Sequence, residues 1–228
     1  MDILGFIPAR GGSKGILKKN VCQLNGHPLI YYSIKTALES LINRLIVSTD
    51  SQEIAEVGLQ FGAEVPFLRP KELAQDHSTI EDALMDTLNR LGKEKYHPDI
   101  IVLLHPTTPF RRTQHINASI DLLIKNSADT VVSVSDPMEH PGDMVYWDKE
   151  GQMKYLLDID HTKMQRQHYP KYYFHNGVVY AFTAKSFMEN KDRFGSKVIP
   201  YQMRQIDSID IDSMDDLKIA EAILKLRK

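Results

Sequence analysis

Short apolar runs alternate with longer amphipathic segments along most of the chain. A continuous apolar run is typical of a strand buried on both faces, whereas apolar residues repeating about every three to four positions are typical of a helix. The pattern predicts strands at 3–8, 44–49, 63–68, 99–104 and 130–135, and helices at 27–40, 51–61, 79–93 and 113–125. This order predicts a single α/β domain, residues 1–228, with a mostly parallel sheet and helices on both of its faces.

The pattern changes between residues 137 and 170. Segments 144–147 and 153–157 alternate in polarity around Asp148-Lys149-Glu150-Gly151, which predicts a β-hairpin. Its apolar side chains need a cover, either the parent domain under a closed flap or a second copy of the chain. We favour the second reading and predict that 137–170 is an inserted dimerisation arm of a homodimer.

After this arm, the pattern predicts strands at 177–182 and 208–212 and a final amphipathic helix. Ser213 and Asp216 have the spacing of a capping box at the start of that helix. Its inward face would carry Leu217, Ala220, Ile223 and Leu224.

The charge balance excludes several classes of partner. The 228 residues contain 28 basic and 30 acidic side chains, for a net charge of −2, so we expect neither nucleic acid nor an anionic membrane as a partner. The single cysteine, Cys22, cannot form an internal disulfide, and this favours a reducing compartment. No run approaches the roughly 18 apolar residues of a membrane span, and the chain does not open on a leader. We therefore expect a soluble, cytoplasmic protein.

A basic, glycine-rich turn follows the first predicted strand: Ile7-Pro-Ala-Arg-Gly-Gly-Ser-Lys-Gly15. Glycines let backbone N–H groups approach an anion closely, and cations beside them would add attraction. The spacing fits neither the dinucleotide-binding motif nor the P-loop of ATPases. A solvated basic turn is the simpler alternative, but the position at a strand's carboxyl end favours a polyphosphate site. Its cations would be Arg10, Lys14, Lys18 and Lys19.

The segment Ile209-Asp-Ile-Asp212 contains two carboxylates, one on each side of Ile211. In an extended segment Asp210 and Asp212 would lie on one face and the two isoleucines on the other. Paired carboxylates at a strand end are hard oxygen ligands of the kind that hold Mg²⁺ together with substrate phosphates. The alternative is that both are solvated and Asp212 caps the last helix. Together with the basic turn, the pair favours a Mg²⁺ site.

A third polar cluster, His105-Pro-Thr-Thr-Pro-Phe-Arg-Arg112, follows the most apolar strand. Its prolines restrict the backbone, and we expect Thr107, Thr108 and Arg111 to point into the crevice at the sheet edge. Arg111 would pair with a carboxylate or phosphate, or else form a salt bridge to a neighbouring helix. His105 would contact substrate, orient a water or act as a base, unless it is a purely structural histidine.

These motifs together resemble the acylneuraminate cytidylyltransferases, which include the CMP-sialic acid synthetases. The resemblance rests on 7–15, Lys19-Asn20, 47–50, Arg69-Pro70, 106–111, Asn176-Gly177 and 208–212, and extends from residue 3 to about 224. It implies a Rossmann-like nucleotidyltransferase sandwich. The implied reaction joins CTP to a nine-carbon 2-keto sugar acid, with release of pyrophosphate and a requirement for Mg²⁺.

The resemblance also implies roles for individual residues. Arg10, Lys19, Asp210 and Asp212 would be catalytic, and the two aspartates would hold Mg²⁺. The main chain at Pro8 and Ala9 would read cytosine. The CTP-binding set would be Pro8, Ala9, Arg10, Gly11, Gly12, Ser13, Lys19, Asn20, Arg69 and Ser78. The sugar-binding set would be His105, Thr107, Thr108, Arg111, Arg166 and Asn176.

Two departures from the family pattern concern the sugar. His105 stands where many sialic acid synthetases have glutamine, and Phe174-His175 stand where some have a basic residue. Legionaminic acid or another bacterial nonulosonic acid therefore fits as well as N-acetylneuraminate. A KDO-type or phosphonate cytidylyltransferase is the alternative within the transferases. A nucleotide-binding regulatory protein without turnover is the alternative outside them, although intact Asp210 and Asp212 argue against it.

Overall fold

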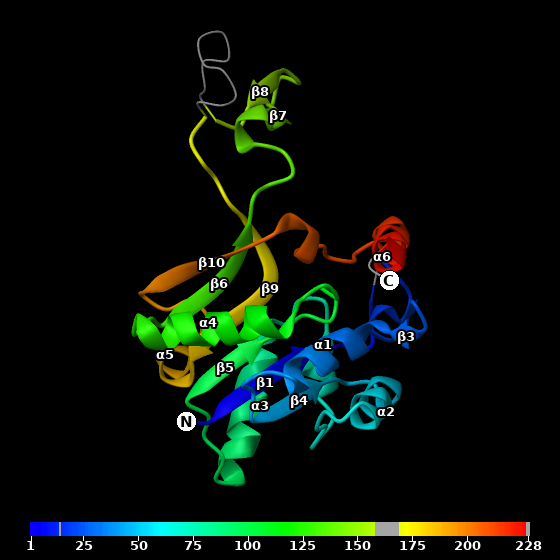
Figure 1. Ribbon diagram of the computed structural model, residues 1–228, viewed down its shortest axis with the longest axis vertical. Coiled ribbons are helices and arrows are strands. Elements are labelled where there is room, and N and C mark those ends of the chain that lie inside the picture. The colour runs from blue at the N-terminus through cyan, green and yellow to red at the C-terminus, as the bar shows by residue number, and fades with distance from the viewer. Residues whose placement is uncertain (14, 158–168, 227–228) are drawn as a thin grey trace.

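The computed structural model describes residues 1–13, 15–157 and 169–226. At its centre is a six-stranded sheet in the order β10-β6-β9-β5-β1-β4 (Figure 1). β9 is antiparallel to both of its neighbours, and the other pairs are parallel. The prediction of a mostly parallel α/β sheet is thus confirmed. The strands are β1 (Ile3–Pro8), β4 (Arg44–Ser48), β5 (Ile100–Leu103), β6 (Thr130–Ser135), β9 (Phe174–Thr183) and β10 (Val198–Met203).

Helices cover both faces of this sheet. Alternate residues of β1 divide between two cores: Ile3 and Ile7 pack with α1, α2 and α4, whereas Leu4 and Phe6 pack with α3 and α5. Burial on both faces explains why β1 and β5 read as continuous apolar runs. The helices are α1 (Leu29–Leu38), α2 (Gln52–Gln60), α3 (Ile80–Lys93), α4 (Thr113–Lys125), α5 (Ala184–Asn190) and α6 (Met214–Leu226).

Local signals explain most helix starts. The Ser51 hydroxyl accepts from the N–H of Ile54, and Thr79 forms a capping box with Asp82. α1 starts at Leu29 rather than His27, because His27 and Pro28 form β3 (His27–Pro28), which pairs with β2 (Gln23–Leu24). No helix in the described part of the chain is long and apolar enough to cross a membrane.

Two predicted strands are wrong. Residues 63–68 contain Pro66, which cannot donate to a ladder, and only an isolated bridge between Ile46 and Glu64 forms there. Residues 208–212, which we call the carboxylate segment, belong to none of the described strands. The sheet instead gains β10, whose Pro200 is tolerated because the strand lies at the sheet edge. α5 was not predicted either.

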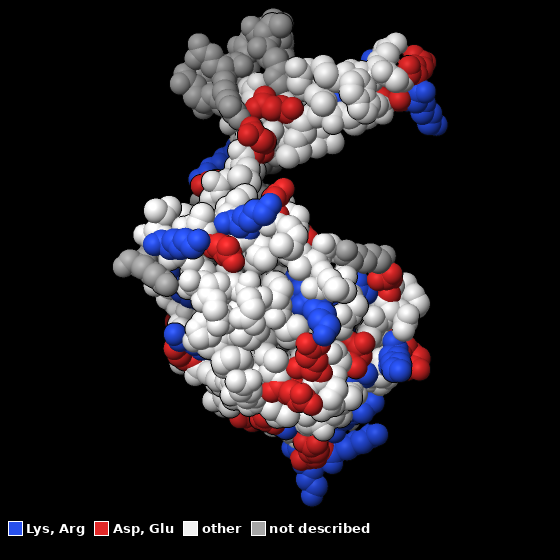
Figure 2. Space-filling model, turned by 90° about the vertical axis from the view of Figure 1, so that its right-hand side faces the viewer, with Lys and Arg blue, Asp and Glu red and all other residues white. Residues whose placement is uncertain are grey.

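The predicted hairpin is confirmed and stands away from the sheet (Figure 1). It consists of β7 (Val145–Trp147) and β8 (Met153–Tyr155), and all six of these residues are exposed. Figure 2 shows a largely uncharged surface along this projection, with charged side chains gathered near its tip and its base. Dimerisation through the arm stays a prediction, and residues 158–168 of the arm lie outside the described residues.

Candidate active site

A groove lies at the carboxyl ends of β1, β4 and β5, the edge where ligands bind in open α/β sheets. Two adjoining depressions, of about 250 and 430 Å³, share Pro8, Arg10 and His105 in their walls. We call them together the edge groove. The Arg69 lobe is completed by Arg69, Leu73, Gln75, Asp76, Ser78, Thr79 and Ile80. The Lys19 lobe is completed by Ser13, Gly15, Lys19, Asn20, Pro106, Thr107 and Asp212.

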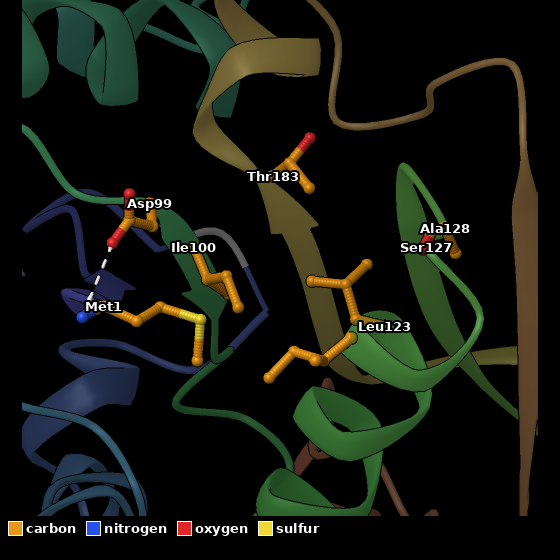
Figure 3. A pocket seen from close by; sticks show the side chains of 8 residues that line it. Met1, Asp99, Ile100, Leu123, Ser127, Ala128 and Thr183 are labelled. Atoms are coloured by element: carbon orange, nitrogen blue, oxygen red, sulfur yellow. Dashed lines mark ion pairs between the residues drawn. The ribbon is translucent and has the colours of Figure 1, made fainter.

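A larger depression of about 470 Å³ opens at the opposite ends of the strands (Figure 3). Its described wall includes no Lys or Arg, and its one carboxylate, Asp99, lies 3.9 Å from the N-terminal amine of Met1. Most of the other side chains around it are apolar, among them Ile100 and Leu123. This depression therefore lacks the groups that bind a polyanion, and the edge groove is the candidate site.

The glycine-rich turn is tied into the groove wall by main-chain contacts. The Gly11 N–H donates to Asp50 at the end of β4, at 2.8 Å, so this donor is not free for an anion. Gly12 has open space around its α-carbon. Gly15 is required for a different reason, since a Cβ there would lie 2.3 Å from the carbonyl oxygen of Asp212. The turn and the carboxylate segment therefore pack directly against each other, 197 positions apart in sequence.

Three of the predicted cations are described, and two face the groove. Arg10 Nη1 lies 3.1 Å from Asp76 Oδ1 and also donates to the carbonyl of Gln75. Lys19 Nζ lies 2.8 Å from Asp212 Oδ1. Lys18 instead pairs with Glu53 of α2, which corrects its assignment to the phosphate site. Lys14 lies outside the described residues.

The remaining nucleotide candidates form the floor and wall of the two lobes. Arg69 is buried and donates to Ser48, both to its hydroxyl at 3.0 Å and to its carbonyl. Burial lowers the pKa of this guanidinium, although Asp50 nearby offsets part of the shift. Asn20 is buried in a 3₁₀ turn (Lys19–Val21) and donates to the Arg10 carbonyl at 2.9 Å. Ser78 lines the Arg69 lobe and donates to the carbonyl of Glu72.

The two aspartates of the carboxylate segment have different surroundings. Asp210 is exposed, but neighbouring groups partly desolvate its carboxyl and so raise its pKa. The negative charge of Asp212 adds to this rise, while the Thr107 side chain and Lys19 oppose it. Asp212 already has a cation, the Lys19 ammonium. No cluster of three or more potential metal ligands occurs among the described residues. A cation here would need ligands from phosphates and water, as Mg²⁺ does at nucleotide sites.

His105 lies where the two lobes meet. Burial lowers its pKa to about 4, and the nearby positive charges of Arg111 and Arg193 act in the same direction. The ring is therefore uncharged near neutral pH and is a hydrogen-bonding group rather than a cation. Its ring contacts Tyr180 edge to face, with 5.8 Å between the centroids. Thr107, beside it, lines the Lys19 lobe.

Three predicted sugar contacts are turned inward. Arg111 is 4% exposed and donates to the Val178 carbonyl at 2.6 Å and to the Thr108 hydroxyl at 3.0 Å. Thr108 is itself buried. Asn176 is buried as well, and its side chain joins Ser133 to Ser208. The expectation that Thr108 and Arg111 point into the crevice is wrong, because main-chain carbonyls and hydroxyls of the interior take up these groups. Arg166 lies outside the described residues.

Sequence reasoning missed the carboxylates that hold the site together. Asp50 binds the glycine-rich turn, Asp76 binds Arg10, and Asp207 is buried among Arg112, Arg204 and His115. Asp50 is the last residue of the recognised motif 47–50 and Asp207 directly precedes the motif 208–212, so their positions were a usable signal. The partners of Asp207 lie 3, 92 and 95 positions away in sequence, and no local pattern pairs them.

The chain was compared with known protein families and structures. A family model described as "Cytidylyltransferase" matches residues 4–226. The chain is 35% identical to the CMP-N,N'-diacetyllegionaminic acid synthase of Legionella pneumophila, over 100% of this chain and 98% of that protein. It is 31% identical to the pseudaminic acid cytidylyltransferase of Campylobacter jejuni, over 99% of this chain and 97% of that protein.

Solved structures share the fold at much lower identity. CMP:2-keto-3-deoxy-manno-octonic acid synthetase complexed with CTP is similar over 100% of both chains, with a TM-score of 0.75 and 15% identity. This likeness shows that the two chains share a fold and carries nothing further about the substrate. The family model and the two relatives, which match almost from end to end, confirm the resemblance found in the sequence: the chain belongs to the cytidylyltransferase family.

Proposed function

We propose that this enzyme couples CTP to a nonulosonic acid and releases pyrophosphate. The observation that carries the proposal is the 35% identity to a CMP-diacetyllegionaminic acid synthase along the whole chain. The second relative, a pseudaminic acid cytidylyltransferase, acts by its name on another nonulosonic acid. The likeness to a KDO synthetase is 15% identical and supports the fold alone, so we do not prefer a KDO-type acceptor.

The edge groove supports this reaction through its two lobes. We assign the cytidine to the Arg69 lobe, against the main chain of Pro8 and the side chains of Arg69 and Ser78. The Lys19 lobe would then hold the triphosphate, because Arg10 and Lys19 face it and its turn carries the open Gly12. Both cations are paired with carboxylates, Asp76 and Asp212, and phosphate oxygens would replace these partners.

Asp210 and Asp212 would hold the Mg²⁺ ion of the reaction. The raised pKa of Asp210 beside a second carboxylate and the ammonium already bound to Asp212 both fit a place for positive charge. When bound there, Mg²⁺ would neutralise charge on the phosphates. Arg10 and Lys19 would stabilise the negative charge that develops on the departing pyrophosphate.

The acceptor would enter beside His105 and Thr107. Its anomeric hydroxyl attacks the α-phosphorus in line and loses its proton to solvent, the bond to the bridging oxygen breaks, and pyrophosphate leaves. A His105 ring that is uncharged near neutral pH would donate or accept a hydrogen bond with a sugar hydroxyl. Catalysis in this arrangement depends on positioning and on charge stabilisation.

We further propose that the arm forms a homodimer and completes the sugar pocket with Arg166. The support is the exposed apolar surface of the hairpin, where Trp147 is 73% exposed and Val145, Tyr146, Met153 and Tyr155 are exposed as well. A two-fold axis would bury this surface against its own copy. The proposed location is the cytoplasm, supported by a single cysteine, which has no partner for an internal disulfide.

The reaction is tested by pyrophosphate release. The protein and Mg²⁺ are incubated with each of the four nucleoside triphosphates and with N,N'-diacetyllegionaminic, pseudaminic, N-acetylneuraminic and KDO acids in turn. We expect release with CTP and at least one of the three nonulosonic acids, and formation of the CMP-sugar by mass spectrometry. Pyrophosphate release with KDO as the only productive acceptor would contradict the proposal and show that the enzyme is a KDO-type cytidylyltransferase. No release with any pair, while CTP still binds, would favour the regulatory alternative.

A further inference from the structure

Asp207 lies directly before the carboxylate segment and is buried, with 1% of its surface exposed. Its Oδ1 accepts from Arg112 Nη2 at 3.2 Å, and its Oδ2 accepts from Arg204 Nε at 2.9 Å. His115 Nε2 is 4.0 Å from the same carboxylate. Burial lowers the pKa of His115 to about 4, so near neutral pH the two arginines neutralise Asp207.

These partners belong to the elements that surround the edge groove. Arg112 ends the loop between β5 and α4, which also carries His105 and Thr107, and Arg204 follows β10 directly. A single carboxylate therefore ties the carboxylate segment to the start of α4 and to the end of β10. The side chains of Arg112 and Arg204 stay 44% and 64% exposed, so the loss of hydration falls mainly on the Asp207 carboxylate. That loss offsets much of the attraction, and the ion pairs add little stability over an apolar packing. The main effect of the Asp207 ion pairs is to fix the backbone of the carboxylate segment in one position.

A second link begins at the next residue. The Ser208 hydroxyl accepts from Asn176 Nδ2 at 2.8 Å and donates to the Arg204 carbonyl at 2.9 Å. Asn176 Oδ1 in turn accepts from Ser133 on β6 at 2.6 Å. The start of the carboxylate segment is thereby held to β6 and β9 as well.

The far end of the segment is held to the groove loops. The Ile211 N–H donates to the Thr107 carbonyl at 2.9 Å, and the Ile211 side chain is buried between Asp210 and Asp212. Because Gly15 has no side chain, the Asp212 carbonyl can pack directly against its α-carbon, where there is no room for a Cβ. Asp212, which lines the Lys19 lobe, and Asp210 thus lie on a backbone fixed before, between and after them, without a strand ladder.

We propose that Asp207 is a positioning residue, which with the Asn176–Ser208 link sets the spacing of the Asp210 and Asp212 carboxylates for a divalent cation. This inference rests on the proposed Mg²⁺ role of those two aspartates. Neither Asp207 nor Ser208 lines the edge groove, so both act through the backbone. Outer partners of metal ligands typically change metal affinity by about 10–100-fold when they are removed.

The test measures metal binding without turnover. Mn²⁺ is titrated into the full-length protein with CTP and no acceptor, and the relaxation of water protons reports the enzyme-bound ion. The variant Asp207→Asn removes the negative charge while the side chain keeps nearly the same shape. The variant Ser208→Ala removes only the hydroxyl that binds Asn176 and is the milder change. Glu64→Gln is the matched control, because Glu64 also pairs with an arginine, Arg44, at 2.8 Å, but on a strand start remote from the groove. Asp212→Asn is the control for the metal site itself.

We expect Asp207→Asn and Ser208→Ala each to raise the Mn²⁺ dissociation constant by about tenfold, while Glu64→Gln leaves it unchanged. Unfolding temperatures are measured in parallel, and if Asp207→Asn fails to fold, Ser208→Ala decides. Unchanged Mn²⁺ affinity in the folded variants, with Asp212→Asn weakened, would overturn the positioning role alone. Unchanged affinity in Asp212→Asn would overturn the metal assignment and this inference with it.

Discussion

The edge groove and the projecting hairpin differ in what holds their side chains. Around the groove, buried polar contacts link residues far apart in sequence, as Arg111 does to Val178 and Asp207 to Arg112. On the hairpin, the strand residues are exposed and the described contacts are mostly local, such as that of Lys154 with Asp148. The groove is held in shape by contacts within one chain, whereas the exposed apolar hairpin is the basis of the proposed dimer. The predictions below test this contrast, from the largest expected effect to the smallest.

Asp212→Asn should have the largest effect. The substitution keeps the shape but removes the anion that binds Lys19 and is proposed to hold Mg²⁺. We expect kcat to fall on the order of 10³-fold, with a higher Mg²⁺ requirement and an unchanged unfolding temperature. Steady-state rates across a Mg²⁺ titration measure this. Asp215→Asn is the control, since Asp215 is exposed and pairs with Lys218 at 2.9 Å. Equal rates in the two variants would make Asp212 a solvated carboxylate.

Arg10→Ala should follow, with a fall in kcat of about 10²-fold. Arg10 faces both lobes of the groove, and its charge gains interaction as negative charge accumulates on the departing phosphates. Lys18→Ala is the matched control, because Lys18 is a cation of the same turn that pairs with Glu53 outside the groove. The measurement is kcat and the KM for CTP in both variants. A higher KM with unchanged kcat would reduce Arg10 to a ground-state contact.

The hairpin prediction concerns assembly rather than chemistry. Charged substitutions at Val145 and Trp147 should convert the dimer to monomer and raise the KM for the sugar by about tenfold, with little change in CTP affinity. Light scattering and steady-state kinetics measure the two effects. Met188→Asp on α5 is the control, since Met188 is about as exposed as Val145. An unmodified protein that is monomeric at micromolar concentration and fully active would refute both the dimer and the shared pocket.

The sequence predicted those parts of the fold that depend on local pattern. β1 and β5 were found because burial on both faces leaves an apolar run, and α3 was found because its apolar residues repeat at helical spacing. β10 was missed because an edge strand can contain Pro200 and expose alternate side chains. In the carboxylate segment, the predicted alternation holds without a strand: Ile211 is buried and Asp210 and Asp212 are exposed.

The site was predictable in its residue types and less so in their contacts. Arg10, Lys19, His105 and Asp212 do come together, because strand order alone brings the carboxyl ends of β1 and β5 to one edge. Arg111 and Asn176 were assigned to the sugar because the family resemblance implies it. Their partners, Val178 and Ser208, lie 67 and 32 positions away, so their burial depends on tertiary packing that no local pattern encodes.

The last prediction concerns stability rather than activity, through the pH dependence set by two histidines near the groove, His105 and His115. Burial lowers the pKa of each to about 4, from 6.5. The unfolded chain therefore takes up these protons first, so the stabilisation is complete above about pH 6.5 and is lost as the pH falls toward 4. In that window, each histidine should lower the free energy of unfolding by up to about 1.4 kcal/mol for each unit that the pH falls.

The variant His115→Asn isolates the contribution of one histidine to the pH dependence of stability. The Arg112 N–H donates to His115 Nδ1 at 3.2 Å, and an asparagine oxygen can accept the same bond while it does not titrate. Between pH 6.5 and 4, we expect the free energy of unfolding to fall less steeply in the variant than in the unmodified protein. Above pH 7, the two proteins should show the same pH dependence. Urea unfolding at half-unit pH intervals measures both curves. If the two curves stay parallel through this window, His115 binds its proton equally in the folded and unfolded chains, and the buried Asp207 carboxylate has compensated for the cost of burying the charged ring.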